Sequence, residues 1–386
     1  MRGIATSSPP ATQSLITMPD PRTYVDMALP LVKTLPECAD FFKTVEPFIP
    51  QLYHLPTQVA AHITDTQALK ELYLNTNPLI SSLAFATMFL TPIVLVLSEF
   101  NRNYSQVDRL WSLLPALYNV HYAVWAHLNG LPTMKLDHVM AVSIIWSARL
   151  TFNYWRKGGY EVGSEDYRWL IVKDYIGGPA MFVFNVTFIS LYQNILLWLI
   201  ATPTYVLLLA SRISGNQVTS YDTLFGRGML VLVVFEFFAD QAQWNFYKAR
   251  GVYHNTAKVP SNYKYTREQL DRGFNTTGLF AWSRHPNFAA EQAFWVALYQ
   301  WSCLETETYA NWAGAGALAY LLLFQGSTWL TELLSAGKYP EYKVYQERVG
   351  MFLPTFGTKS MDAPLNDKEQ RKVNDAKAGK GAMKTK

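Results

Sequence analysis

The feature that most constrains this chain is a series of long stretches without a single charged residue. Residues 79–97, 110–134, 180–211 and 308–331 contain no Asp, Glu, Lys or Arg. About 20 such residues in a helix span the roughly 30 Å of a bilayer's hydrocarbon core. Because no water can satisfy backbone groups there, these stretches predict membrane helices rather than an open sheet.

Other apolar stretches are shorter or carry a charge, and they raise the expected number of membrane helices. Residues 138–148, 228–238 and 287–304 belong to this group. The stretch 180–211 is too long for one straight span at about 1.5 Å per residue, and Pro203 lies inside it, so we expect a kink or turn there. The sequence therefore predicts an all-α, polytopic transmembrane helix bundle with about six to eight membrane helices.

The composition excludes several other classes of protein. Charged residues make up 16% of the chain, whereas soluble domains carry about a quarter. The formal net charge of +4, without a basic stripe of interleaved aromatics, gives no reason to expect nucleic acid as a partner. The two cysteines and seven histidines show no ligand spacing, so we expect no metal. Membrane lipids are the expected partners, and the oligomeric state stays open.

Three regions differ in composition. Residues 1–77 are polar and Pro-rich, and we expect an extension with short amphipathic helices. Residues 78–356 hold the apolar stretches and form the expected membrane-embedded domain. Residues 357–386 are rich in Lys, which predicts a disordered, cytosolic tail. Because the N-terminus lacks an apolar core like that of a signal peptide, insertion is expected to begin at an internal helix.

Acidic residues inside apolar helices are candidates for chemistry, because charges in hydrocarbon normally face a cavity or a partner. Glu236 and Asp240 are four residues apart and share a helix face. Such a pair can provide a buried acid and a contact to a ligand. The alternative is that they only hold the bundle together by pairing with Arg149 or Arg227.

The run GLFAWSRHPNFAAE at 278–291 is the strongest local signal. Pro286 suits the first turn of a helix, so Arg284 and His285 lie at a helix start where a guanidinium and free N–H groups can bind phosphate. Asn287 and Glu291 then share one face and can present an amide and a carboxylate to one ligand. Alternatively, the two basic residues only anchor an ordinary membrane helix at the interface.

A basic stretch precedes this run. Lys248 and Arg250 begin it, and lysines, arginines and tyrosines continue to residue 272. It is either a solvated loop or a docking surface for a phosphorylated nucleotide. Tyr154 is a candidate proton donor, although phenols near an interface usually serve as anchors.

These motifs together resemble a known family. The run at 278–291 is similar to the C-terminal signature of the steroid 5-alpha-reductases. SQVDRLWS (105–112), EDYRW (165–169) and KYPEYKVYQERV (338–349) resemble one branch of it, a group of membrane proteins with a domain of unknown function. The resemblance covers about residues 79–354. The family is also related to sterol reductases and to isoprenylcysteine carboxyl methyltransferases.

The resemblance implies a membrane reductase that uses NADPH to reduce a carbon–carbon double bond in a sterol, enone or other lipid, plausibly in the endoplasmic reticulum. It implies that Asp240, Lys248, Arg250, Arg284, His285 and Asn287 bind the cofactor, and that Glu291, Glu236 and Tyr154 serve catalysis. At the place of the family's proton-donating tyrosine this chain has Trp146. The alternatives are an S-adenosylmethionine-dependent membrane methyltransferase and a non-catalytic protein that binds sterols or lipids.

Overall fold

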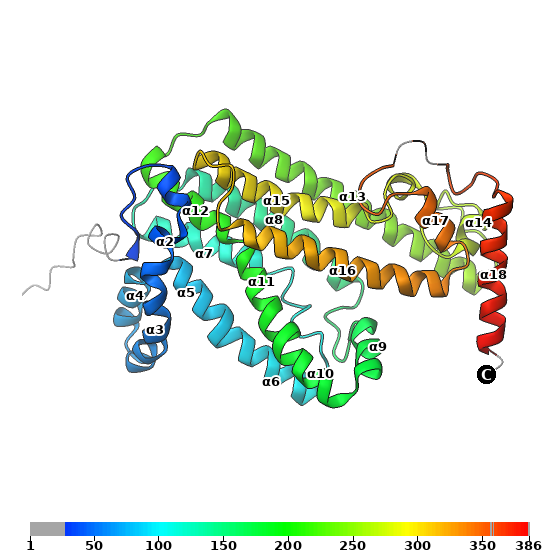
Figure 1. The fold of residues 1–386 in the computed structure, drawn as a ribbon, viewed down its shortest axis with the longest axis horizontal. Helices are drawn as coiled ribbons and strands as arrows, with labels where there is room; N and C mark the ends of the chain where they lie inside the picture. The colour runs from blue at the N-terminus through cyan, green and yellow to red at the C-terminus, as the bar shows by residue number, and fades with distance from the viewer. Residues whose placement is uncertain (1–27, 356, 358, 385–386) are drawn as a thin grey trace, which may run out of the picture.

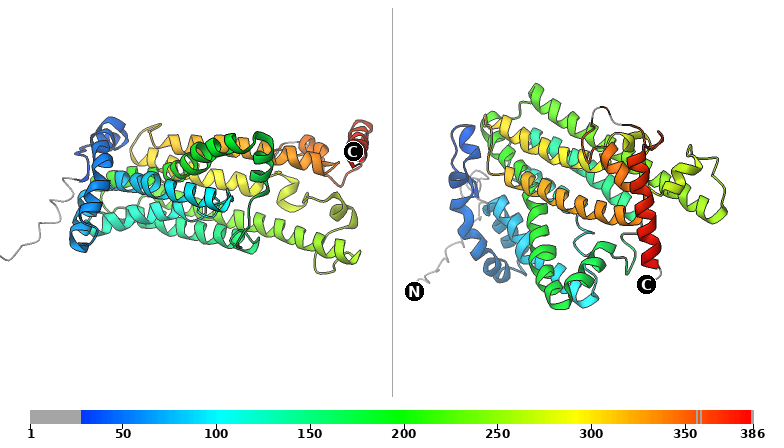
Figure 2. Two further views of the ribbon diagram at one scale, coloured as in Figure 1. Left: turned by 90° about the horizontal axis from the view of Figure 1, so that it is seen from below. Right: turned by 45° about the vertical axis from the view of Figure 1, so that its right-hand side comes forward.

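The computed structural model describes residues 28–355, 357 and 359–384, and in this part of the chain it contains helices and no β-strand. Four long helices run along the longest dimension of the molecule (Figure 1). They are α8 (Met134–Arg156), α13 (Ser220–Thr256), α15 (Pro286–Glu305) and α16 (Gly314–Lys338). α13 packs against both α15 and α8, and α16 packs on α15. Views from two further directions confirm this elongated bundle (Figure 2).

Local sequence signals explain where the central helices begin. α13 starts with a capping box in which Thr219 and Asp222 satisfy each other's backbone N–H groups. α15 starts at Pro286, as we predicted, because proline lacks the N–H that would have no partner in a first turn.

The uncharged stretch 308–331 forms most of α16, and the other three contribute the remaining helices of the bundle. Pro78–Asn101 is continuous and comprises α5 (Pro78–Ala84), the π-helical η3 (Phe85–Leu90) and α6 (Thr91–Asn101). The other helices of the bundle are α7 (Leu114–Leu128), α10 (Gly178–Phe184), the π-helical η4 (Asn185–Tyr192), α11 (Gln193–Leu199) and α12 (Thr202–Ser214). The expected turn before Pro203 lies between α11 and α12.

Two of these helices, Pro78–Asn101 and Gly178–Ser214, are long and apolar enough to cross a membrane by length and composition alone. Gly178–Ser214 lies mostly inside the protein, whereas most of Pro78–Asn101 is exposed. The described residues thus contain two candidate spans of this kind, fewer than the six to eight we predicted. The other long helices carry buried charges or aromatic residues, which lower their apolarity.

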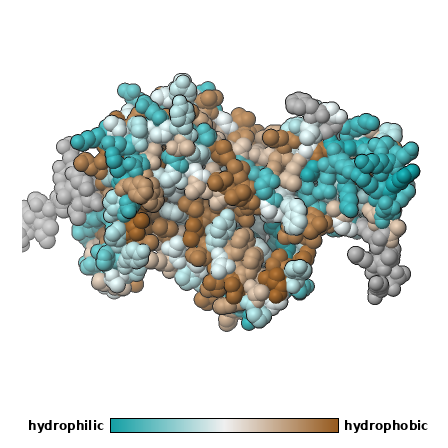
Figure 3. All heavy atoms as spheres, in the orientation of Figure 1, coloured by the Kyte–Doolittle hydropathy of each residue, from teal (hydrophilic) through white to brown (hydrophobic). Residues whose placement is uncertain are grey.

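Large apolar side chains are exposed on several of the long helices. On α13 they include Val231, which is 66% exposed, and Phe238, which is 60% exposed. Leu322 and Trp329 of α16 are each 63% exposed. Figure 3 shows apolar surface over the middle of the molecule and polar surface over the end that holds α18 (Asp367–Lys384). Such a contiguous apolar surface is unusual for a soluble protein.

The N-terminal region forms short helices at one end of the bundle. They are η1 (Pro36–Ala39), α2 (Phe41–Thr44), η2 (Glu46–Phe48), α3 (Ile49–Ala61) and α4 (Thr66–Asn75). Residues 1–27 of the predicted extension lie outside the described residues. The extension is joined to the bundle because Asn77 donates a hydrogen bond to the Tyr205 hydroxyl and Tyr205 donates to the Thr44 carbonyl.

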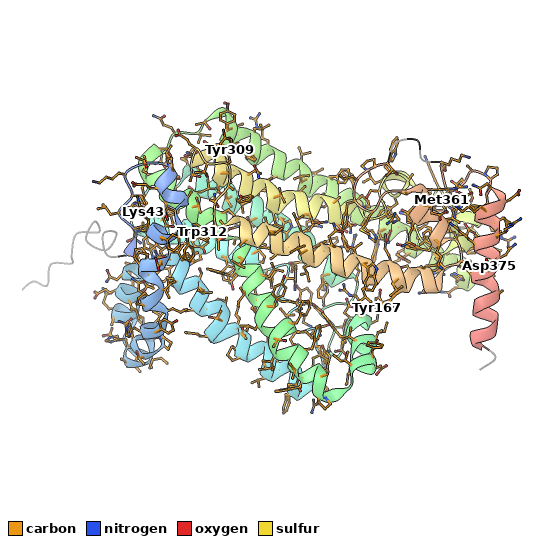
Figure 4. The ribbon with its side chains drawn as sticks, in the orientation of Figure 1. Lys43, Tyr167, Tyr309, Trp312, Met361 and Asp375 are labelled. Carbon is orange, nitrogen blue, oxygen red and sulfur yellow. The ribbon has the colours of Figure 1, made fainter. Side chains whose placement is uncertain are left out.

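The opposite end carries α9 (Tyr167–Ile176), α14 (Arg267–Arg272), η5 (Gly278–Ala281), α17 (Tyr342–Arg348) and α18. Here the predicted disordered tail is wrong, because α18 is a helix. Glu369 accepts two hydrogen bonds from Arg348, and Met361 and Val373 join a small core with Phe274. Two apolar residues and one carboxylate are enough to dock an otherwise Lys-rich segment. Figure 4 labels Met361 and Asp375 at this end.

Candidate functional site

A buried arginine faces three carboxylates at the centre of the bundle. Arg149 of α8 donates hydrogen bonds to Asp240 and Glu291, each at 2.9 Å, and forms an ion pair with Glu236. All four side chains are at most 8% exposed. We call these four residues the Arg149 cluster. It joins α8, α13 and α15, so the three predicted acidic residues meet around one cation.

Glu291 is the most heavily hydrogen-bonded member of the Arg149 cluster. Besides Arg149, its carboxylate accepts hydrogen bonds from the indoles of Trp146, at 3.0 and 3.1 Å, and Trp295, at 3.0 Å. The hydroxyl of Tyr320, from α16, donates at 2.8 Å. With this many donors the orientation of Glu291 is fixed. Trp146, at the position implied for a tyrosine, thus contacts the predicted catalytic carboxylate.

Asn287 connects the Arg149 cluster to a cavity. Its amide donates a hydrogen bond of 3.1 Å to Asp240, and its side chain lines a cavity of about 640 Å³. We call this the main cavity. It lies between α13, α15, α16 and the helices at the C-terminal end of the bundle; Tyr167, labelled in Figure 4, is part of its wall. The side chain of Asn287 therefore contacts a buried acid on one side and lines the cavity on the other.

Aromatic rings dominate the wall of the main cavity. They come from Tyr167, Tyr247, Phe274, Phe280, Phe288, Tyr339, Tyr342 and Tyr345. Gly273 positions two of them: its φ of +92° turns the chain into Phe274, and a Cβ there would lie 2.6 Å from the Tyr339 ring. Flat rings around a cavity of this size suit a ligand with planar aromatic groups.

Three buried polar atoms in this wall have no hydrogen-bond partner. They are the carbonyl oxygen of Gln243, the Nε of Arg250 and the amide nitrogen of Asn275. Asn275 is only 2% exposed. An unpaired buried polar group costs free energy, so a polar ligand that reached these atoms would stabilise the wall by pairing them.

Arg284 and His285 line the main cavity, but a protein carboxylate already binds both. Arg284 donates from Nε and Nη2 to the two oxygens of Glu332, at 2.6 and 2.9 Å, and His285 Nε2 lies 2.9 Å from Glu332. The remaining nitrogen of Arg284 donates to the carbonyls of Gln346 and Val349. The predicted pairing of Arg284 with a phosphate would therefore have to replace the carboxylate of Glu332.

Two other predicted residues lie away from the main cavity. Lys248 lines a separate pocket, although Arg250, two residues later, lines the main cavity. Tyr154 packs edge-on against Tyr160, with ring centroids 5.0 Å apart, and lines neither hollow. The structure therefore does not bring Tyr154 to the predicted acids.

Two members of the site have only weak signals in the sequence. The sequence marks Arg149 as one of two possible partners for Glu236 and Asp240, with nothing to favour it over Arg227. Tyr320 lies in an uncharged stretch where a single hydroxyl did not stand out. A buried phenol within an apolar helix needs a hydrogen-bond partner, so Tyr320 could have been expected to contact a polar group of the bundle.

The Arg149 cluster and the main cavity can support two kinds of chemistry. The cavity offers unpaired donors and an acceptor beside stacked rings, which suits a large ligand with polar and aromatic parts. The cluster has three carboxylates and one guanidinium, so a single buried cation faces three acidic side chains. Together they describe a binding cavity beside a buried acid–base group in an all-helical protein.

Comparisons with known proteins give a family without an assigned activity. Residues 94–349, which contain the Arg149 cluster and the whole wall of the main cavity, match the family described as "Protein of unknown function (DUF1295)". The chain belongs to this family. It is 37% identical over 328 residues to the uncharacterized protein C594.04c of Schizosaccharomyces pombe. This alignment covers 84% of this chain and 93% of the yeast protein. No solved structure matches.

Proposed function

We propose that this protein is a membrane-embedded, NADPH-dependent reductase of a carbon–carbon double bond in a sterol, enone or other lipid. The observation that supports this most is the main cavity, with its aromatic wall and unpaired polar atoms, which ends at Asn287. Asn287 in turn hydrogen-bonds to the Arg149 cluster. A cofactor site beside a buried acid is the arrangement that a hydride transfer followed by protonation requires.

The proposed location is the bilayer, with six to eight helices crossing it, and the endoplasmic reticulum is the proposed membrane. The exposed apolar side chains on α13 and α16 support this placement, because they lie outside the two helices that qualify by composition alone. The buried charges of these helices are paired inside the protein, as is expected of charges in membrane helices: Glu236 and Asp240 of α13 pair with Arg149, and Glu332 of α16 pairs with Arg284.

NADPH supplies a hydride when it is bound. Arg250 and Lys157 line the main cavity and are the side chains proposed to hold its phosphates. The amide of Asn275 is placed to donate to a ribose or phosphate oxygen, and the tyrosines of the wall stack on its planar rings. Arg284 and His285, bound to Glu332, keep the floor of the cavity rigid.

The Arg149 cluster is proposed to provide the proton for the second alkene carbon. Asn287 separates its acids from the main cavity, and the hydrogen bond from Asn287 to Asp240 orients the amide for the nicotinamide end of the cofactor. Glu291 positions Tyr320 and Arg149 through its hydrogen bonds. In this assignment Glu236 stores the proton, and Glu291, which accepts hydrogen bonds from Arg149, Trp146, Trp295 and Tyr320, holds the surrounding groups in place.

The test is ligand-dependent stabilisation of the purified protein in detergent, with NADPH, NADH and S-adenosylmethionine as separate ligands. At a ligand concentration 100 times the Kd, binding adds about 2.7 kcal/mol to the free energy of unfolding, so the melting temperature rises. We expect NADPH to raise it and S-adenosylmethionine to leave it unchanged. A rise with S-adenosylmethionine alone supports a methyltransferase and contradicts the reductase.

A lipid comparison separates an enzyme from a silent lipid-binding protein. Cells that lack the protein are compared with cells that carry the wild type, Asn287→Ala or Glu291→Gln, with protein levels matched. A reductase predicts that an unsaturated lipid accumulates in the deletion and in both variants. If both variants restore the wild-type lipid profile, catalysis by this site is contradicted.

A further inference from the structure

A second hollow, of about 460 Å³, lies where the end of α8 meets α13. We call it the rim pocket; it is lined by Trp155, Arg156, Tyr160, Glu161, Trp244 and Lys248. Lys157 and Gln243, the chain neighbours of Arg156 and Trp244, line the main cavity instead. Since consecutive residues on a helix point in different directions, the rim pocket and the main cavity lie on different sides of α8 and α13.

The rim pocket holds two cations, Arg156 and Lys248, and one carboxylate, Glu161, with which neither cation forms an ion pair. The guanidinium carbon of Arg156 and the ammonium nitrogen of Lys248 each lie 4.8 Å from the centroid of the Trp244 ring. Arg156 hydrogen-bonds only to the neutral side chains of Asn153 and Gln241. In the part of the chain that the structure describes, neither cation forms an ion pair within 4 Å of an acid. Their positions are fixed by a ring and by amides, so both charges remain available to an anion.

The rim pocket lies at the border between apolar and polar surface. Phe238 of α13, 60% exposed, lies less than two turns before Trp244, and Phe152 of α8, 47% exposed, lies one turn before Arg156. Trp155 itself is 62% exposed. Beyond Lys248 the chain becomes basic and polar as far as residue 272. An exposed tryptophan beside cations, at the end of an apolar surface, marks the level of lipid headgroups.

We propose that the rim pocket binds the phosphate of a membrane glycerophospholipid. Arg156 and Lys248 contact the phosphodiester, the apolar side chains below them contact the acyl chains, and Glu161 faces the amine of the headgroup. Two cations and one carboxylate match a headgroup that carries one phosphate and one amine. The proposal rests on the bilayer placement given above and is independent of the reductase activity.

The test measures the melting temperature of the detergent-purified protein with two lipids that share the same acyl chains. Phosphatidylethanolamine carries the phosphate and amine, and diacylglycerol lacks both. We expect phosphatidylethanolamine to raise the melting temperature more than diacylglycerol. In Lys248→Gln at least half of this difference is lost, whereas the matched control Arg227→Gln, an exposed arginine on the same helix, keeps it. Arg156→Gln repeats the test on the other cation.

Each shift is taken relative to the same variant without lipid, so a small loss of stability in the variant does not mask the result. Equal shifts with both lipids, or an unchanged difference in Lys248→Gln, overturn the proposal. Glycerol 3-phosphate serves as the soluble arm, and an equal shift with it assigns the pocket to free phosphates and also overturns the proposal. If the protein stays in solution without detergent, the bilayer placement fails, and NADPH binding is still tested separately.

Discussion

At the scale of single residues, the Arg149 cluster depends on one cation. Replacing Arg149 by Gln leaves three buried carboxylates, Glu236, Asp240 and Glu291, without a counter-charge. Removing one partner from a buried ion pair costs about 3–5 kcal/mol, so we expect a large drop in the free energy of unfolding. Tryptophan fluorescence during denaturation in detergent measures it. Arg227→Gln is the control, and equal midpoints for the two variants contradict the central role of Arg149.

The two basic residues that the sequence grouped together give a sharper test of the main cavity. Arg250 lines it and has an unpaired Nε, whereas Lys248 lines the rim pocket. We expect Arg250→Gln to weaken NADPH binding about tenfold, which corresponds to about 1.4 kcal/mol, and Lys248→Gln to leave the Kd unchanged. Titration of cofactor fluorescence measures both. Equal losses in the two variants indicate a diffuse electrostatic effect rather than a bound phosphate.

Residue pairing is also where sequence reasoning failed, for a physical reason. An arginine before the first proline of a helix looks the same whether it faces a phosphate or a carboxylate, and Glu332 lies 48 residues from Arg284. The partner of Arg149 on α15 is 142 residues away. Such distances are set by packing of whole helices, which local patterns do not encode. The acids themselves could be predicted, because a charge in an apolar helix is rare.

At the scale of helices, the positions of the elements were predicted better than the residue pairs, because an apolar stretch without charge sets both the length and the position of a helix. The turn between α11 and α12 follows from Pro203 and the excess length of the stretch. The tail was predicted wrongly because its many lysines outweighed Met361 and Val373 in composition. Two buried side chains decide whether a short helix docks, and an average over the segment does not register them.

The crossing of α16 over the junction of α11 and α12 depends on Gly316. A Cβ at this position would lie 2.3 Å from the carbonyl oxygen of Leu199 and 2.8 Å from the nitrogen of Ile200, so the backbones must separate. We expect Gly316→Ala to lower the free energy of unfolding by about 1–3 kcal/mol. In the same helix Gly326 has no atom near its Cβ position, and Gly326→Ala should be neutral or stabilising by up to about 1 kcal/mol. If both variants have the same denaturation midpoint, the close crossing is wrong.

Docking of α18 should depend on pH. Hydrogen bonds from Arg348 lower the pKa of Glu369 to about 2, from an ordinary value near 4.5. A lowered carboxyl pKa stabilises the docked state fully above pH 4.5, and this stabilisation is lost as the pH falls toward 2. A dye on Asp375→Cys should therefore become more mobile over this range, as measured by fluorescence anisotropy. Glu369→Gln should show high mobility already at pH 7; the same dye on Tyr309→Cys reports any general unfolding.

At the scale of the whole molecule, the proposed bilayer placement makes the two ends of the bundle chemically distinct. Tyr309 lies in the loop before α16, and Asp375 lies in α18, beyond the other end of α16 (Figure 4). α16 has 25 residues, and at 1.5 Å per residue it is about 37 Å long, enough to cross roughly 30 Å of hydrocarbon. Tyr309 and Asp375 should therefore lie on opposite sides of the membrane.

Cysteine labelling tests this arrangement directly, because Cys38 and Cys303 are buried and give little background. Tyr309→Cys and Asp375→Cys are expressed separately, and sealed vesicles are treated with a maleimide that cannot cross membranes. We expect only one of the two variants to react in sealed vesicles and both to react after detergent is added. Reaction of both variants in sealed vesicles means that α16 does not separate two compartments. In that case the exposed apolar side chains of α13 and α16 must be covered by protein rather than lipid, because so much apolar surface is not stable in water.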